Sequence, residues 1–570
     1  MIAITLANQA ASKNMANGFA VRTAIDLPSS ENAMSFLSEN IKHIVHMRQR
    51  MSKDNRLGLC LGAGVSMDFN IPSWKVLIER IACDESVNGS DLLKVSESLT
   101  AQSQFLYQKY RQSLPSDDLN EDDVIKARRV QTGWLKLVHK CLYATAKIKD
   151  SDLKEHPYLW ELAPLIKRSA MTINYNFDDT VERMLYCHNS EREIPTGEDK
   201  GFEVIWQPTA QFRRNQGVIY HPNGFLPLQT VDGLSEQVVF MEQEFADQLV
   251  DVGAGHYVSL LSHLAKHTIV FMGLSMSDAN LKHLLRISAR SNPGNFHYHV
   301  HWCGEVKPST EEQDAIRKAN FGVYNLVTLF LSTSEIKELA RLLVADQDDF
   351  NAICDAEPHG TRTEYKYYLT GPVGTGKTTT LEQLKSIATF DEWVDRRNPL
   401  LGRPHSELSE GERADVDSWI NQQFRKKNRR VSAASQIIAA IDRSPLDPLY
   451  FVKDDSAVAN RALELLKWMV PPESSVKSIA AGHLIVLLCD PRVLVLRLAG
   501  RDKTYNIEQL ISQIDTVKQM WESMGATIID TTNLTSSQVV TKVLKVILFQ
   551  PYSPIDFDQI CKDKASGASA

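Results

Sequence analysis

The sequence predicts an α/β protein with two units. The first is a Rossmann-like, doubly wound parallel sheet with a helical insertion, and the second is a smaller α/β domain with a phosphate-binding loop. Short apolar runs that end in glycine or polar residues recur over residues 35–345, which is typical of buried parallel strands. A further apolar run at 365–369 leads into Gly-x-x-x-x-Gly-Lys-Thr at 371–378. At 570 residues, the chain is also too long for one hydrophobic core.

The composition is that of an ordinary globular protein. A formal net charge of -7, with charges of both signs, gives no strong signal for binding nucleic acid or a membrane. The first 30 residues lack a basic segment followed by an apolar core, and no segment approaches about 18 uninterrupted apolar residues. We therefore expect a cytoplasmic protein. Its eight cysteines are scattered without a C-x-x-C pair, so we expect reduced thiols and no zinc site.

The first unit is organised around an apolar run at 57–61 that meets Gly62, Ala63 and Gly64 and then Ser66. This pattern predicts a buried strand that carries a nucleotide's phosphates on the following turn. Glycine has no Cβ, so backbone N–H groups could approach a diphosphate, and the start of a following helix would add a favourable dipole. Ser66 would add a hydroxyl donor. Small residues also close ordinary strand-to-helix turns, so both interpretations remain open from this stretch alone.

Other segments of the chain follow from periodicity and composition. A helix is predicted at 31–51, and apolar residues at helical spacing predict a helical insertion at about 91–150. The aromatic residues of this insertion fit a core better than cofactor contacts. The expected division is an N-terminal segment, the first unit, a linker, the second unit and a flexible tail, at 1–34, 35–345, 346–363, 364–555 and 556–570.

Three later segments of the first unit repeat the design of an apolar strand that ends in polar residues. Their polar and glycine positions are Thr172, Asn174 and Asn176, then His221, and then Gly273, Ser275, Asp278 and Asn280. In an open α/β sheet, ligands bind in a crevice at the carboxyl ends of the strands. We therefore expect the three clusters to converge on the first glycine turn.

In this order, the motifs at 62–66, 172–176, 221–224 and 273–281 resemble those of the sirtuin superfamily. They are especially similar to the sirtuin-like NAD-consuming effectors of bacterial antiphage defence, over about residues 35–345. The resemblance implies an NAD glycohydrolase that releases nicotinamide and ADP-ribose. It also implies a homo-oligomer, with a companion defence protein as a further partner.

By this resemblance, Asn174 orients the nicotinamide ribose and the attacking water, and His221 is a base towards that water or a ribose hydroxyl. A histidine that is neutral near pH 7 suits this task. The residues expected to bind NAD are Gly62, Ala63, Gly64, Ser66, Thr172, Asn176, Gly273, Ser275, Asp278 and Asn280.

The sequence also departs from the family pattern. The four-cysteine zinc module of deacylating sirtuins is missing, and residues 71–74 read Ile-Pro-Ser-Trp where deacylases carry Asp-Phe-Arg, which disfavours protein deacylation. Family members carry the catalytic histidine immediately before the glycine of the turn, and here that residue is Asn223. Because residues i and i+2 of a strand face the same side, His221 could still reach the ribose, or it is a structural histidine.

The second unit contains a phosphate-binding loop with all its elements in place. Its residues are Gly371, Gly374, Gly376, Lys377, Thr378 and Thr379. Backbone N–H groups would cradle the phosphates, Lys377 would neutralise their charge, and Thr378 would ligate Mg²⁺. We therefore expect ATP or a deoxynucleoside triphosphate with Mg²⁺ at this loop.

The order of elements over residues 364–550 is similar to that of nucleoside and nucleotide kinases of the thymidylate and deoxynucleoside kinase kind. By that similarity, Asp442 and Arg443 face the acceptor nucleotide, and Arg497 and Arg501 belong to a lid over the transferred phosphate. Glu392 is either an acceptor-site carboxylate or a solvated surface acid.

Two hypotheses follow from the whole sequence. The first is an NAD glycohydrolase effector of antiphage defence that is regulated by, or coupled to, a nucleotide-binding kinase-like domain. The second is a nucleoside or nucleotide kinase whose sirtuin-like unit only senses NAD or ADP-ribose, and Asn223 is the feature in its favour.

Overall fold

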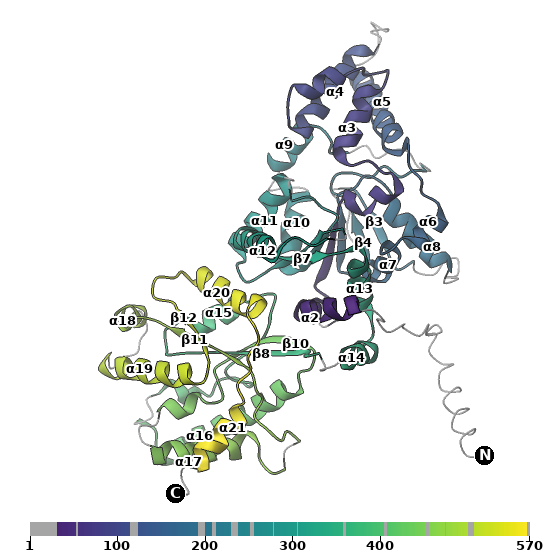
Figure 1. Ribbon diagram of the computed structural model, residues 1–570. Helices are drawn as coiled ribbons and strands as arrows, with labels where there is room; N and C mark the ends of the chain where they lie inside the picture. Colours follow the sequence, from purple (N-terminus) through teal and green to yellow (C-terminus); the bar gives the residue numbers. More distant parts are fainter. Residues whose placement is uncertain are drawn as a thin grey trace, which may run out of the picture.

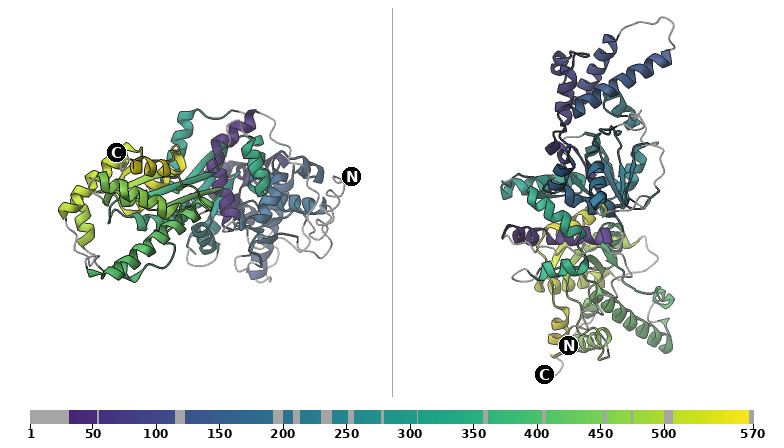
Figure 2. Two further views of the ribbon diagram at one scale, coloured as in Figure 1. Left: turned by 90° about the horizontal axis from the view of Figure 1, so that it is seen from below. Right: turned by 90° about the vertical axis from the view of Figure 1, so that its right-hand side faces the viewer.

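The structure, a computed structural model, describes residues 31–52, 55–114, 123–191, 200–207, 213–229, 238–250, 256–276, 279–304, 306–356, 361–403, 407–451, 455–473, 475–499 and 507–566. These residues form two parallel sheets flanked by helices, with helix α2 (Glu31–Ser52) between the two units (Figure 1). The predicted α/β class is confirmed. The molecule is elongated, with the helical insertion at one end and the second unit at the other (Figure 2).

Over the described residues, the first sheet has seven parallel strands in the order β3-β4-β2-β1-β5-β6-β7. Their bounds are β1 Leu57–Leu61, β2 Met171–Asn174, β3 Glu203–Ile205, β4 Val218–Tyr220, β5 Thr268–Met272, β6 His297–Trp302 and β7 Leu326–Leu331. Every residue of β1, β2 and β5 is buried, which explains their largely apolar runs. The register pairs Leu61 with both Asn174 and Met272, so these three central strands end at the same level.

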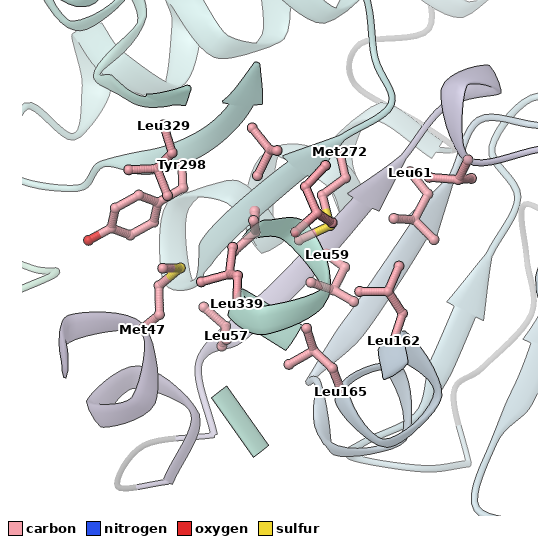
Figure 3. Packing of buried hydrophobic residues seen from close by; sticks show 14 of the residues in the cluster. Met47, Leu57, Leu59, Leu61, Leu162, Leu165, Met272, Tyr298, Leu329 and Leu339 are labelled. Atoms are coloured by element: carbon pink, nitrogen blue, oxygen red, sulfur yellow. The ribbon is translucent and has the colours of Figure 1, made fainter. Parts of the chain in front are cut away.

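Helices cover both faces of this sheet. Their bounds are α7 Leu159–Arg168, α8 Thr180–Glu191, α10 His256–Lys266, α11 Ala279–Ser291, α12 Thr310–Tyr324 and α13 Thr333–Val344. On one face, Leu59 packs in one core with Leu162 of α7 and Leu339 of α13 (Figure 3). On the other face, α10 and α11 supply Leu264 and Leu284 to a separate core.

The helical insertion projects from the first unit, away from the second (Figure 1). It contains α3 Trp74–Cys83, η3 Ser90–Lys94, α4 Leu99–Ser113 and α5 Asp123–Tyr143, and α9 Glu242–Val250 packs beside α4. The next helix, α6 Asp150–Glu155, packs on α7 and α8. Trp134 is buried against Tyr107, Tyr110 and Phe240, so these aromatic side chains belong to a core.

The second sheet has, among the residues described, five parallel strands in the order β12-β11-β8-β10-β9. Their bounds are β8 Glu364–Thr370, β9 Ala388–Phe390, β10 Ile437–Asp442, β11 His483–Leu488 and β12 Thr527–Asp530. The helices around it are α15 Lys377–Gln383, α16 Glu410–Ala433, α17 Asp455–Met469, α18 Pro491–Ala499, α19 Ile507–Ser523 and α20 Ser536–Phe549. Strand β8 lies at the centre and delivers the phosphate-binding loop.

Two segments are more ordered than the sequence predicts. The expected linker at 346–363 contains α14 (Gln347–Asp355), which buries Phe350. The expected flexible tail at 556–570 contains α21 (Phe557–Ser566), which packs on α17 and buries Phe557 and Cys561. In both segments, a few apolar side chains at helical spacing are enough to dock a short helix, although the surrounding composition is polar.

Candidate functional site

The carboxyl ends of the central strands of the first sheet bring the predicted polar clusters together. Asn174 ends β2 beside Leu61 of β1. Tyr220 of β4 pairs with Ile173, so His221 follows at the same edge of the sheet as Asn174. The glycine turn, Asn174 and His221 therefore share one side of the unit.

The turn after β1 packs directly on the turn after β5. Gly62 N–H donates to Met272 O at 3.1 Å, and Gly64 N–H donates to Gly273 O at 2.9 Å. A Cβ on Gly62 would lie 2.5 Å from Leu274 Cδ2, and a Cβ on Gly64 would lie 2.8 Å from Gly273 Cα. The two N–H groups are thus engaged within the protein, whereas the sequence predicts them as phosphate donors.

The chain after this turn differs from the predicted helix start. It continues through two single 3₁₀ turns, η1 (Ala63–Val65) and η2 (Met67–Phe69), and the next α-helix, α3, begins only after Ser73 caps it. Asn70 adopts a left-handed conformation at φ 57°, and Pro72 lacks the N–H that a continuing helix needs. No α-helix dipole therefore points from residues 63–69 at the turn.

Ser66 and Asn176 stabilise the turn after β1 through side-chain hydrogen bonds. The buried Ser66 hydroxyl donates to Asp178 Oδ1 at 3.0 Å. Asn176 Nδ2 donates to Gly62 O at 3.0 Å. Burial raises the pKa of Asp178, and hydrogen bonds from Thr180 and Ser66 oppose that rise. Both predicted NAD-binding residues therefore fix the conformation of the turn through these contacts.

His221 is fully buried, and both its ring nitrogens have partners. Nδ1 lies 2.9 Å from the Asn176 carbonyl oxygen, and Nε2 lies 2.9 Å from Glu182 Oε1 on α8. With Glu182 as a carboxylate, both partners are acceptors, and each ring nitrogen then carries a proton. Burial alone would lower the pKa of His221, but the Glu182 carboxylate, the Asn176 carbonyl and Asp178 together raise it. This arrangement differs from the predicted neutral base, since it leaves no ring nitrogen to accept a proton.

Asn174 is a buried residue of this site whose side-chain amide has an unpartnered donor. Its Oδ1 accepts from the Asn176 N–H at 3.1 Å, whereas its Nδ2 has no hydrogen-bond partner among the described residues. A buried amide donor without a partner costs roughly 1–3 kcal/mol. Asn223, which occupies the place of the family histidine, is also buried, and its carbonyl accepts from Val239 N–H at 2.8 Å.

The remaining predicted NAD-binding residues have different positions. Thr172 is buried within β2, where its hydroxyl lies 3.2 Å from that of Ser169. Ser275 is exposed beyond β5, and Asn280 lies in the first turn of α11. Asp278 lies outside the described residues.

The phosphate-binding loop surrounds the start of α15. Its glycines Gly371, Gly374 and Gly376 have φ values of 137°, 87° and 99°, which side chains disfavour. Lys377 Nζ donates to Gly371 O at 2.7 Å and to Pro372 O at 2.9 Å. Burial, with the nearby charge of Arg443, lowers the pKa of Lys377 to about 8. The next two residues, 378 and 379, expose their hydroxyl-bearing side chains on the first turn of the helix.

Asp442 and Arg443 lie at the carboxyl end of β10, next to this loop. The Arg443 Nε lies 2.5 Å from Glu392 Oε1, so Glu392 is part of an ion pair and only partly exposed. Glu392 and Arg443 line a pocket together with Trp393 and Phe424. Asp442 is buried, and its Oδ1 has no hydrogen-bond partner in the part of the chain that the structure describes.

Of the two predicted lid arginines, Arg497 is bonded to the loop after β12. Arg497 lies within α18, which continues to Ala499, and its guanidinium donates to Thr531 O at 2.7 Å and to Thr531 Oγ1 at 3.1 Å. It therefore joins α18 to the loop after β12, because the helix runs past the expected start of the loop. Arg501 lies outside the described residues.

Sequence reasoning missed two acidic groups at these sites. Glu182 holds His221 from 39 positions away, and no motif marks it. Asp447 accepts from the Thr370 hydroxyl at 2.7 Å beneath the phosphate-binding loop, and burial raises its pKa to about 6. A buried hydroxyl at the end of β8, Thr370, is the signal that could have indicated a partner for Asp447.

No helix in the described ranges combines the length and apolar character needed to cross a membrane. Those same ranges contain no group of three or more His, Cys, Asp or Glu side chains arranged to hold a metal ion. Residues 170–324 match the family model described as a SIR2-like domain. This match covers the first unit from β2 to the end of α12, and it leaves out strands β1 and β7.

One curated relative is similar to part of the chain. A pyruvate, phosphate dikinase regulatory protein of Syntrophomonas wolfei is 23% identical over 177 residues, which are 29% of this chain and 63% of that protein. The chain therefore spans less than two thirds of the length of this relative.

Among solved structures, deoxyadenosine kinase from M. mycoides with bound dATP has a TM-score of 0.25 and 13% identity, covering 31% of this chain and 96% of that one. The tunicamycin resistance protein of Deinococcus radiodurans has a TM-score of 0.23 and 19% identity, covering 34% and 99%. The P-loop assignment of the second unit rests on its own strand order and glycine loop.

Proposed function

We propose that the first unit is an NAD glycohydrolase and that the second unit binds ATP or a deoxynucleoside triphosphate with Mg²⁺. The observation that carries the first part is the buried Nδ2 of Asn174, whose unused donor lies where three strand ends and the glycine turn meet. A ribose hydroxyl or a water on the nicotinamide ribose would satisfy this donor. The match to a SIR2-like domain supports NAD as the dinucleotide.

In the proposed reaction, the bond between C1′ of the ribose and the pyridine nitrogen breaks, and nicotinamide leaves with the electron pair. The sugar becomes cationic, water adds at C1′, one of its protons stays on the new C1′ hydroxyl, and the other passes to solvent. Asn174 orients the ribose and the water. His221 is a positioning residue, because its bonds to Asn176 and Glu182 fix the floor of the crevice.

The proposed NAD contacts are those of the sequence-based set. Residues of the turn at 62–66, together with Gly273 and Ser275, would form the pyrophosphate side. Asn176 would hold this turn through its bond to Gly62 O, and Thr172 would support the site from within β2. Asp278 and Asn280 would contact the adenosine side. The role in antiphage defence, the homo-oligomer and the companion protein rest on the family resemblance and belong to the same proposal.

At the second site, Lys377 would move from the carbonyls of Gly371 and Pro372 to the phosphates. Thr378 would contribute a hydroxyl ligand to Mg²⁺, and the unpartnered Oδ1 of Asp442 fits the same cation. Mg²⁺, when bound, would neutralise the phosphate charge.

A kinase activity of the second unit is the alternative function. It is favoured by the pocket that Glu392 and Arg443 share with Trp393 and Phe424. Aromatic side chains can stack on a base, and a carboxylate can accept the proton of an acceptor hydroxyl.

The two functions are separated by their products. Purified full-length protein is incubated with NAD and with a panel of ribo- and deoxynucleosides plus MgATP, and products are resolved by chromatography. We expect nicotinamide and ADP-ribose in equal amounts from the wild type, and a loss of about 100-fold or more in Asn174→Ala. Lys377→Ala should retain NAD cleavage and change only its response to nucleotide. A phosphorylated nucleoside with intact NAD would replace the first function by the second.

A further inference from the structure

Helix α2 is shared by the cores of both units. Lys42 Nζ donates to Ile547 O at 3.0 Å, and Gln49 Oε1 accepts from Ile438 N–H at 3.0 Å, both in the second unit. On another face, Met47 of α2 is buried in the core of the first unit (Figure 3). Helix α2 therefore contacts both units directly, so a movement of the second unit would displace α2.

The end of the P-loop helix α15 is held by the first unit through a buried histidine. His46 Nε2 lies 2.6 Å from Ser386 O, just beyond α15, and its Nδ1 lies 2.9 Å from the Tyr298 hydroxyl. Burial lowers the pKa of His46 to about 3, so the ring is neutral. Nε2–H must then donate to Ser386 O, and Nδ1 must accept from Tyr298. Ser386 Oγ also accepts from Phe296 N–H at 3.2 Å, which ties it to the segment before β6.

A glycine allows the closest approach between the units. A Cβ on Gly294 would lie 1.7 Å from the carbonyl oxygen of Gln383, the last residue of α15. No side chain fits there unless the two units separate. We call the contact formed by His46, residues 294–296 and residues 383–386 the junction.

The junction connects the two nucleotide sites through short, rigid elements. At one end of α15, Lys377 bonds the P-loop carbonyls, and it must exchange these bonds for phosphate oxygens when a nucleotide binds. At the other end, the junction lies beside the amino ends of β1 and β6. Strand β1 then spans five residues, or roughly 17 Å, from there to the glycine turn.

A cavity beside the junction is lined by both units. Its volume is about 430 Å³, and its walls include Arg50 and Arg56 from the first unit and Thr378 and Asp442 from the second. The expected Mg²⁺ ligand Thr378 thus shares a cavity with Arg50 of α2 and with Arg56, which immediately precedes β1. A bound Mg²⁺–nucleotide would change the charge beside Thr378 and Asp442. This change would alter the electrostatic interaction with the guanidinium groups of Arg50 and Arg56 across the cavity.

We propose that nucleotide binding at the P-loop is communicated through the junction to the turn at 62–66 and so changes the affinity of the crevice for NAD. The communication to the crevice rests on the proposed NAD site. By linkage, NAD would change the affinity for nucleotide by the same factor, typically about 5–150-fold.

Hydrogen exchange tests the structural step without requiring any NAD chemistry. Full-length protein is compared with and without saturating MgATP and, in parallel, MgdATP. In the wild type we expect altered exchange at 57–64 and 294–300 as well as around the P-loop. Gly294→Ala should confine the change to residues 364–550. The matched control Gly322→Ala, on the exposed face of α12 with no atom within 4 Å of the new Cβ, should behave as the wild type.

A milder variant keeps the test interpretable if Gly294→Ala does not fold. Ser386→Ala removes the acceptor of the Phe296 N–H and should reduce the exchange change at 294–300. The inference is overturned if the wild type shows no change outside 364–550, or if Gly294→Ala and Ser386→Ala both retain the wild-type pattern. If exchange follows the prediction but NAD is neither bound nor cleaved, the junction stands and the proposed NAD function fails.

Discussion

The two units end their central strands in glycine turns that meet different physical needs. In the first unit, neither Gly62 nor Gly64 has a positive φ, and each would clash with the turn after β5 if it carried a Cβ. In the second unit, Gly376 has a φ of 99° and no atom within 4 Å of an added Cβ. Glycine is thus used once for close packing and once for backbone conformation.

The charged groups of the two sites also differ in the partners that hold them. In the crevice, His221 is fixed between a carboxylate and a carbonyl, and Asp178 accepts from Ser66. At the P-loop, the hydrogen bonds that Lys377 Nζ makes within the described residues go to carbonyl oxygens of its own loop. The crevice is therefore expected to be rigid, whereas the P-loop lysine can exchange its partners for phosphate.

Loss of the Glu182 carboxylate should give the largest effect on the crevice. Breaking a buried ion pair costs about 3 kcal/mol, so Glu182→Gln should lower the free energy of unfolding by that order. Because its environment raises the pKa of His221 above the ordinary value of 6.5, the pair's stabilisation is fully present below that pH. It is lost as the pH rises through the raised pKa of the folded protein.

Urea unfolding of the wild type and Glu182→Gln at a series of pH values from about 5.5 upward measures this difference. The control is Glu191→Gln on the same helix, whose pair with Lys154 is exposed and worth about 1 kcal/mol or less. A loss of stability in Glu182→Gln that grows as the pH rises would show that His221 is not held as a cation by Glu182.

Alanine at the two kinds of glycine should cost about 1–3 kcal/mol for different reasons. In Gly62→Ala the new Cβ meets Leu274 Cδ2 and Cγ at 2.5 and 2.6 Å. Leu274→Ala should therefore recover part of the stability, with a coupling of about 1 kcal/mol in a double-mutant cycle. In Gly376→Ala the new Cβ has no neighbouring atom, so the loss of stability comes from the positive φ, and no second substitution should relieve it. Thermal unfolding of all four variants tests this, and additive effects of Gly62→Ala and Leu274→Ala would contradict it.

Arg497→Ala should have the smallest effect, about 1 kcal/mol of stability from its lost hydrogen bonds to Thr531. Its affinity for MgATP should stay within twofold of the wild type. Arg492→Ala, on the same helix but highly exposed, should change stability less. A tenfold loss of MgATP affinity in Arg497→Ala, but not in Arg492→Ala, would support the predicted role of Arg497 in a lid over the phosphate.

Much of the fold could be predicted because parallel strands buried on both faces leave strong local signals. The runs that became β1, β8, β10 and β11 are apolar and end in glycine or polar residues. The meeting of Gly62, Asn174 and Gly273 also followed from sequence, since the carboxyl ends of adjacent parallel strands lie at one edge.

Contacts that depend on tertiary placement could not be predicted. The Glu182 partner of His221 comes from a helix, and which helix face meets β4 is set by packing rather than by a motif. The docking of α14 and α21 depends on cores formed by distant residues. Gly294 looks like an ordinary turn residue in sequence, and only the position of α15 explains it.

The most direct test is an experimental structure of full-length Asn174→Ala with NAD and MgATP, since this variant should bind NAD without cleaving it. We predict NAD in the crevice, with its pyrophosphate beside the turn at 62–66 and its nicotinamide ribose at residue 174, and MgATP at Gly371–Thr379. NAD at the P-loop, or a crevice that stays unoccupied at saturating NAD, would contradict the account.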